Sequence, residues 1–324
     1  MTSPLSLVAD IGGTNTRVAL ARGHEVDHGS IRRYPNADYP ALEQVLAAYL
    51  GESGGPECGG ACVAVAGPVD NGVARLTNRD WVIDPKAVAK ATSVATVHVL
   101  NDLQAQGHAL SHLERESLRP LIPAAPGRSR PGPQLVVGVG TGFNAACVIA
   151  KDGQEIVTAS ESGHVTLPVR TEAELRLAEY VEQAHGFAGV EDVLSGRGLE
   201  RLFAWHAIGA GREDRSSAAE IMAAMADGTD DLLRETGLAF VRLLGRVVGD
   251  LALSYLPFGG VHLIGGVARA FTPHYEAFGL RDAFRDKGRF SAFMDQFPVF
   301  VIEDDYAALT GCAAFLDRQM RTGR

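Results

Sequence analysis

The sequence predicts an α/β protein built from two lobes. Its 324 residues are too many for one ordinary hydrophobic core. Hydrophobic residues make up 46% of the chain and charged residues 21%, and 37 glycines accompany 15 prolines, a composition typical of globular α/β proteins. A strand, a Gly-Thr turn and a second strand follow one another after residue 5 and again after residue 135, which indicates that both lobes begin alike.

The first lobe is expected to have the element order β-β-β-α-β-α-β. Apolar runs predict the strands, apolar residues at helical spacing predict the helices, and Pro40, Gly51 and Asp84-Pro85 mark helix ends. The expected strands are 5–10, 17–20, 31–34, 61–66 and 97–100, and the expected helices are 40–51 and the one opened by Asp84-Pro85.

The second lobe is expected to begin after an exposed linker at 123–133. Its predicted strands are 135–139, 145–150, 261–264 and 299–302, with helices dominating 172–256. A final helix at 306–320 is expected to fold back onto the first lobe. The predicted division is therefore a small lobe of residues 1–112 plus 303–324 and a large lobe of residues 113–302.

Charge and cysteine content restrict the classes of partner. A net charge of −9 argues against nucleic acid or an anionic membrane, because no basic excess is available to neutralise phosphates. There is no signal-like N-terminus and no apolar run that approaches a membrane span, so we expect a cytoplasmic protein. Of the four cysteines only Cys58 and Cys62 are close in sequence, and no second Cys or His pair completes a zinc site, which favours buried free thiols.

Two glycine-rich turns are the first candidates for ligand binding. Gly12-Gly13-Thr14 and Gly140-Thr141-Gly142 each follow a strand, and backbone amides with threonine hydroxyls can bind the anionic oxygens of a phosphate chain. The alternative is a hairpin that uses glycine for positive φ with no ligand. Neither turn opens a helix, and the absence of Gly-x-x-x-x-Gly-Lys-Ser/Thr excludes a Walker P-loop.

Acidic residues beside these strands are candidates for metal binding and proton transfer. Asp10 ends the first strand, where a carboxylate can hold Mg²⁺, or can simply cap the turn. Asp102 follows Asn101 at a strand end and can accept the proton of an attacking hydroxyl while Asn101 orients the same substrate. The alternative is that Asp102 is the N-cap of a helix at 103–113.

A further polar group lies in Glu161-Ser162-Gly163-His164. Its carboxylate and imidazole suit hydrogen bonds to neighbouring sugar hydroxyls, although a loop ion pair or a buried structural histidine would give the same pattern. Glu191 by itself would be interpreted as a surface acid.

Together these motifs resemble the bacterial ATP-dependent glucokinase family, within the sugar kinase, heat-shock protein and actin superfamily. The resemblance covers nearly the whole chain in order. It is carried by Ala9-Asp10-Ile11-Gly12-Gly13-Thr14-Asn15, Ala66-Gly67-Pro68-Val69, Leu76-Thr77-Asn78 with Trp81, Asn101-Asp102, Gly140-Thr141-Gly142, Glu161 to His164, Val193-Leu194-Ser195-Gly196 and Ile264-Gly265-Gly266.

The resemblance implies two ribonuclease H-like lobes, an actin-like ATPase fold, around a central cleft, often in a homodimer. It implies ATP and Mg²⁺ as cofactors, with phosphoryl transfer to the 6-hydroxyl of glucose and Asp102 as the base. The implied phosphate-binding residues are Ala9, Asp10, Ile11, Gly12, Gly13, Thr14, Gly140, Thr141 and Gly142, with Asp10 at the metal. Adenosine is implied near Gly265 and Gly266, and the sugar at Asn101, Asp102, Glu161, His164 and Glu191.

The chain departs from the family pattern at two positions. Phe143-Asn144 stands where the family has Leu-Gly after Gly-Thr-Gly, and we expect Asn144 to keep the turn by accepting left-handed φ. Ser162 replaces the glycine that usually follows the glutamate. A kinase for another hexose, such as mannose or N-acetylglucosamine, and a non-catalytic sugar- or nucleotide-binding sensor are the alternative functions.

Overall fold

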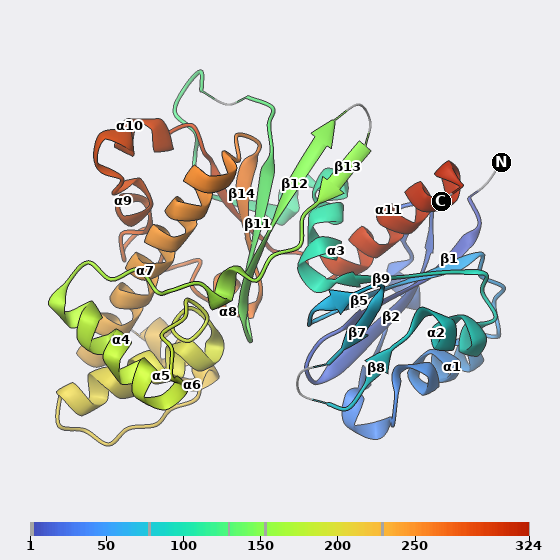
Figure 1. Cartoon of the computed structure of the whole chain (residues 1–324), viewed down its shortest axis with the longest axis horizontal. Coiled ribbons are helices and arrows are strands. Elements are labelled where there is room, and N and C mark those ends of the chain that lie inside the picture. The colour runs from blue at the N-terminus through green and yellow to red at the C-terminus, as the bar shows by residue number, and fades with distance from the viewer. Residues whose placement is uncertain (1–2, 77–78, 129, 152–153, 228–229, 324) are drawn as a thin grey trace. The chain divides into compact units, whose positions relative to one another are not determined.

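The structure is a computed structural model that describes residues 3–76, 79–128, 130–151, 154–227 and 230–323. Thr77 and Asn78, which contribute to the resemblance, lie outside the described residues. The chain forms two compact units (Figure 1). Unit 1 comprises Met1–Glu114 and Asp304–Arg324, and unit 2 comprises Arg115–Glu303. The boundaries between the two lobes were predicted after residues 112 and 302, close to those of the structure, after residues 114 and 303.

Unit 1 is built on a mixed sheet in the strand order β3-β2-β1-β5-β9, with β4 also paired to β2. β1, β5 and β9 are parallel, and β2 is antiparallel to β1. Every residue of β5 is buried, as expected for a strand covered on both faces. The strands are β1 (Leu5–Ile11), β2 (Asn15–Arg22), β3 (Glu25–Val26), β4 (Arg32–Pro35), β5 (Gly60–Val65) and β9 (Thr96–Asn101).

Helices cover both faces of this sheet (Figure 1). α1 (Leu42–Glu52) and α2 (Pro85–Thr92) share a core with Leu7, Ala9 and Ile11 of β1. α3 (Asp102–Ala109) and α11 (Ala307–Thr322) pack with Val8 on the opposite face. The last helix of the chain therefore belongs to the unit in which the chain begins.

Short elements of unit 1 differ from the sequence prediction. β3, with two residues, and a separate small sheet of β6 (Val69–Asp70), β7 (Val73–Arg75) and β8 (Val82–Ile83) are additional to the predicted order. The helix expected at 103–113 begins at Asp102 and ends at Ala109, and a 3₁₀ turn follows at Leu110–His112. Strands of two or three residues are too short to show an alternation of apolar residues, so periodicity misses them.

Unit 2 repeats the arrangement of the first sheet. Its order is β10-β15-β14-β11-β12-β13, in which β11, β14 and β15 are parallel and β12 is antiparallel to β11. The series β12-β11-β14-β15 thus matches β2-β1-β5-β9, which confirms the predicted internal repeat. The strands are β10 (Leu118–Ile122), β11 (Gln134–Val139), β12 (Phe143–Lys151), β13 (Gln154–Val157), β14 (Gly260–Ile264) and β15 (Val299–Ile302). β10 and β13 are additional to the strands predicted from the sequence.

The helices of unit 2 pack against this sheet around one large core. The side chains of Thr171, Ser195 and Asp230 each accept a backbone N–H in the first turn of α4, α5 and α7, which explains where these helices begin. Among the described residues the helices of unit 2 are α4 (Glu172–His185), α5 (Gly196–Gly209), α6 (Ala218–Asp227), α7 (Asp231–Tyr255), α8 (Gly266–Ala270), α9 (Leu280–Arg285) and α10 (Ser291–Met294).

The cysteines are free thiols. Cys62, Cys147 and Cys312 are buried, as predicted, whereas Cys58 is only partly buried. Within the described parts of the chain, no helix combines the length and the apolar character needed to cross a membrane.

A buried histidine in unit 2 makes the stability of the fold depend on pH. His262 of β14 is 3% exposed and stacks on Phe300, with ring centroids 5.3 Å apart. Burial lowers its pKa from 6.5 to about 4. Below pH 6.5 the imidazole of residue 262 binds a proton in the unfolded chain, whereas in the folded chain it binds one only near pH 4. Acidification between these pH values therefore favours the unfolded state and lowers the stability of the fold.

We expect acidification from pH 7 to pH 5 to lower the free energy of unfolding by about 2 kcal/mol through His262. His262→Phe should remove this part of the pH dependence, whereas His185→Phe, on an exposed histidine, should retain it. Urea unfolding of the three proteins at both pH values measures the difference. An unchanged pH dependence in His262→Phe would contradict the assignment.

Candidate functional site

The first glycine turn joins β1 to β2 and contains Gly12, Gly13 and Thr14. The amide of Gly12 donates to the carbonyl of Asn15 at 3.0 Å. The backbone of Gly12 is outside the left-handed region, and a Cβ placed there would meet nothing closer than the Asn15 carbonyl oxygen at 3.5 Å. Neither backbone conformation nor packing therefore requires glycine at this position, and the missing side chain leaves the backbone open to close approach by a ligand.

The second glycine turn joins β11 to β12 in the same way. The amide of Gly140 donates to the carbonyl of Gly142 at 3.0 Å, and the nearest atom to a Cβ at Gly140 would be the Cα of Gly265 at 3.9 Å. Gly140 and Gly142 are also outside the left-handed region. The alternative that these turns use glycine for positive φ is wrong for Gly12, Gly140 and Gly142.

Other predicted nucleotide residues of unit 2 lie beside the second turn. The amide of Gly196 donates to the carbonyl of Gly140 at 2.7 Å, so the start of α5 is attached to the turn. Gly265 follows β14 with φ 112°, and a Cβ there would collide with the carbonyl of Val139. Within unit 2, the turn predicted for phosphate, Gly140–Gly142, therefore lies beside Gly265 and Gly266, which are predicted for adenosine.

A buried asparagine forms hydrogen bonds to the backbone of the first turn. Asn36 is fully buried, its Nδ2 donates to the Gly12 carbonyl at 2.9 Å, and its backbone amide donates to the Thr14 carbonyl at 2.9 Å. Its Oδ1 accepts from the hydroxyl of Thr16 at 2.8 Å. No pattern in the sequence indicates this residue, because nothing local distinguishes an asparagine after a strand from an ordinary turn residue.

Asp10 lies near the end of β1 and is paired with Arg17 on β2. Its carboxylate accepts from Arg17 Nη1 at 3.0 Å, and burial raises the pKa of Asp10 while Arg17 counteracts that rise. No cluster of three His, Cys, Asp or Glu side chains that could hold a metal occurs among the described residues. Mg²⁺ commonly uses one or two carboxylates together with substrate phosphates, so Asp10 fits a metal whose other ligands come from a nucleotide.

The strand β9 ends at Asn101, and α3 begins at Asp102. Asn101 is the helix N-cap: its Oδ1 accepts from the amide of Leu103 at 2.9 Å, and its Nδ2 donates to the carbonyl of Gly67 at 3.0 Å. The alternative that Asp102 is the N-cap is wrong. Asp102 is the first helical residue, and its Oδ1 also accepts from the amide of Leu103, at 2.9 Å.

The predicted site residues of unit 1 lie at the carboxyl ends of the parallel strands of its sheet. β1, β5 and β9 are parallel, so the first turn, Gly67 and Asp102 all follow the carboxyl ends of neighbouring strands. Ligands of open α/β sheets bind at this end of the strands.

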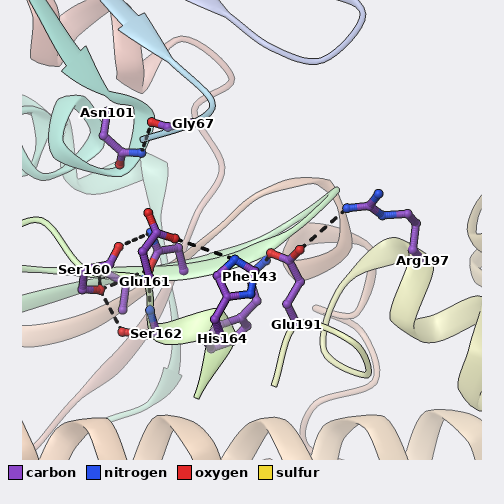
Figure 2. Close-up of polar contacts among 11 residues, drawn as sticks. Gly67, Asn101, Phe143, Ser160, Glu161, Ser162, His164, Glu191 and Arg197 are labelled. Carbon is purple, nitrogen blue, oxygen red and sulfur yellow. Dashed lines mark hydrogen bonds and ion pairs between the residues drawn. The ribbon is translucent and has the colours of Figure 1, made fainter. Parts of the chain in front are cut away.

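In unit 2, Glu161 and His164 are exposed and flank the buried Ser162 and Gly163. The Oε2 of Glu161 and the Nε2 of His164 are 4.0 Å apart, and both side chains are more than half exposed (Figure 2). The alternative of a buried structural histidine is therefore wrong, whereas the two side chains do lie at the distance of a loop ion pair. Both polar groups remain accessible to a ligand.

Glu191 is not the surface acid that its local sequence suggests. Its side chain is 25% exposed, and Oε2 accepts from the amide of Phe143 at 2.8 Å. Oε1 lies 3.7 Å from Arg197 Nη2 (Figure 2). A Cβ at Gly142 would lie 2.5 Å from Oε2, so Glu191 approaches the second turn only because residue 142 is glycine. Only the resemblance, and no pattern around Glu191, indicated this residue.

The expectation for Asn144 is wrong. Asn144 is a residue of β12 and is not among the residues with positive φ. Its side chain instead contacts the Glu161 segment: Nδ2 donates to the Ser160 carbonyl at 2.6 Å, and Oδ1 accepts from the Ser162 amide at 2.9 Å. The second turn ends before this residue, so no left-handed conformation is needed.

Comparison with known proteins gives matches along the whole chain. A protein-family model described as Glucokinase matches residues 7–319. The glucokinase of Saccharophagus degradans is 34% identical over 317 residues, which cover 96% of this chain and 98% of that protein.

Solved structures agree with this fold. The crystal structure of a glucokinase from an Antarctic psychrotroph matches with a TM-score of 0.83 at 29% identity, covering 97% of this chain and 99% of that one. The glucokinase of Balamuthia mandrillaris, solved in complex with glucose, matches with a TM-score of 0.78 at 21% identity, covering 98% and 94% of the two chains. The predicted two-lobed α/β fold is confirmed.

We expect Asn36→Ala to destabilise unit 1 by about 2–3 kcal/mol, because it leaves the Gly12 carbonyl and the Thr16 hydroxyl without a buried partner. Asn15→Ala, at the first residue of β2, removes only an exposed contact to Thr14 and should change stability by less than about 0.5 kcal/mol. Urea unfolding compares the two variants. Equal effects would show that Asn36 does not brace the turn.

Proposed function

The chain belongs to the glucokinase family, and from this premise we propose how its residues carry out the ATP-dependent phosphorylation of glucose. The observation that carries the proposal is the pair of glycine turns. Gly12 and Gly140 lack a side chain where neither φ nor packing demands it, each at the end of a central strand. Such turns can receive phosphate oxygens on backbone amides, which act as donors without adding charge.

Residues of both units take part in the proposed reaction. Residues 9–14 of unit 1 and residues 140–142 of unit 2 bind the phosphates, and Gly265 and Gly266 lie along the adenosine. Glu161, His164 and Glu191 bind hydroxyls of the sugar, with carboxylates as acceptors and the imidazole as donor or acceptor. Asn101 fixes the start of α3 through its contacts with Gly67 and Leu103.

Asp102 is the proposed base. The 6-hydroxyl oxygen of glucose attacks the γ-phosphorus, the bond from that phosphorus to the bridging oxygen breaks, and ADP leaves. The hydroxyl proton passes to the Asp102 carboxylate. Because phosphoryl transfer has a loose transition state, Asp102 acts mainly by orienting the hydroxyl and by taking its proton late.

Asp10 is the residue proposed to hold Mg²⁺. The metal, when bound with ATP, neutralises charge on the phosphoryl oxygens. The contribution of the protein is a carboxylate that β1 and the Arg17 pair hold in place. A homodimer and a cytoplasmic location stay predictions.

The proposal is tested by following ADP release from ATP and Mg²⁺ across a panel of hexoses. We expect release to require a sugar and to be most efficient with glucose, ahead of mannose and N-acetylglucosamine. Asp102→Asn should lower kcat by about 10²–10⁴-fold, because the base is lost while the size of the side chain is kept. Asp84→Asn, on the residue that caps α2, should retain kcat.

ADP release that is independent of sugar would contradict the kinase proposal, and near-normal kcat in Asp102→Asn would contradict the role of Asp102. A higher efficiency with another hexose would correct the substrate but not the reaction.

Substitutions in the glycine turns test whether these turns bind ATP. Gly12→Ala and Gly140→Ala should leave the melting temperature within about 2 °C of the parent, because their Cβ atoms meet no close neighbour. Each should raise KM for ATP about tenfold or more, because the methyl group occupies the space proposed for a phosphate. Gly209→Ala, a glycine of α5 with open space around it, should leave KM unchanged. An unchanged KM in both turn variants would remove the turns from the ATP site.

A further inference from the structure

Asn144 and Ser160 form a polar link between β12 and the segment that carries Glu161 and His164. Nδ2 of Asn144 donates to the Ser160 carbonyl at 2.6 Å, and its Oδ1 accepts from the amides of Ala145 at 2.8 Å and Ser162 at 2.9 Å. One amide group therefore contacts the backbone on both sides of Glu161.

The serine hydroxyls complete this link. Ser160 Oγ lies 2.6 Å from the Ala145 carbonyl oxygen and 3.1 Å from Asn144 Oδ1. Both oxygens can only accept, so these two contacts use the single hydroxyl hydrogen of Ser160. At the 2.8 Å contact between the two serine hydroxyls, Ser162 is therefore the donor and Ser160 the acceptor. Ser162 is 6% exposed, and its contact with Ser160 is drawn in Figure 2.

The same stretch of β12 also holds Glu191. The amide of Phe143 donates to the Glu191 carboxylate at 2.8 Å, and the backbone amide of Glu191 donates to the Gly163 carbonyl at 2.8 Å. A Cβ at Gly163 would collide with the Phe143 carbonyl, so the turn containing Ser162 lies directly on the strand. Phe143 and Asn144 thus touch every segment of unit 2 that carries a proposed sugar residue, and they immediately follow the Gly140–Gly142 turn.

We propose that Asn144 is a positioning residue for the sugar: its side chain fixes Glu161 and His164 relative to the second glycine turn. This inference rests on the function proposed above. The side chain need not touch either substrate. It sets the spacing between the groups that bind sugar hydroxyls and the amides that bind phosphate, and phosphoryl transfer is sensitive to such spacing. Each hydrogen bond is modest, but the Asn144 side chain makes several to one short segment.

The test is steady-state kinetics of Asn144→Gly, which restores the glycine of the family pattern. We expect KM for glucose to rise about tenfold and kcat to fall about tenfold, because a loosened segment orders only when sugar binds. KM for ATP should stay within about twofold, since the backbone of the second turn does not depend on the side chain. A role in folding alone would lower the melting temperature and the active fraction without separating the two KM values.

Two further variants keep the test decisive. Ser160→Ala removes the hydroxyl link without altering β12, and it should raise KM for glucose about threefold to fivefold; it decides the question if Asn144→Gly does not fold. Thr158→Val is the matched control, because Thr158 Oγ1 accepts from the β12 amide of Cys147 at 3.1 Å, outside the Glu161 segment. It should leave KM for glucose unchanged.

The outcomes separate this inference from the proposed function. If the parent protein releases no ADP with any hexose, the proposed function fails and the positioning role fails with it. If the parent is active and Asn144→Gly and Ser160→Ala both retain KM for glucose, or raise both KM values equally, only the positioning role is overturned.

Discussion

The candidate site depends on hydrogen bonds from asparagine side chains, each of which joins two segments of the chain. Asn36 donates to the Gly12 carbonyl and accepts from the hydroxyl of Thr16, and Asn101 donates to Gly67 while it accepts from the amide of Leu103. Asn144 does the same for the Glu161 segment. A carboxamide has a donor and an acceptor in one group, so it can satisfy a carbonyl and an N–H together. These contacts hold loops that a ligand must meet in one conformation.

The sequence was sufficient for features that depend on neighbouring residues. Buried parallel strands appear as continuous apolar runs, and the repeated order of strand, Gly-Thr turn and strand predicted that both units begin alike. The structure extends this likeness to the order of four strands in each sheet. A helix start followed from local capping chemistry at Asp84-Pro85, where Asp84 caps α2 and Pro85 is its first residue. For Glu161 and His164 the sequence left a sugar-binding pair, a loop ion pair and a buried histidine open, and only the structure shows that both side chains are exposed.

Features that depend on distant partners were not predictable from pattern. Asn36 donates to the carbonyl of Gly12, which lies 24 positions earlier in the sequence, and Glu191 accepts from the amide of Phe143 across 48 positions. Asn144 was misinterpreted because the turn was assumed to extend two residues too far. In the structure β12 begins at Phe143, so the Asn144 side chain, and not its φ, carries its role. Such roles follow from packing between segments, which residue order does not encode locally.

The glycine turns also explain how a protein with a negative net charge can bind a nucleotide. A chain with net charge −9 repels a polyanion at a distance, yet neither glycine turn carries a charged side chain, and the acid beside the first turn, Asp10, is paired with Arg17. Repulsion between exposed charges is screened over about 8–10 Å in physiological salt. Amide dipoles act at contact, where screening is weakest. A nucleotide can therefore be bound by an acidic protein, provided that the amides already point at it, and this requires turns that are rigid without bulky side chains.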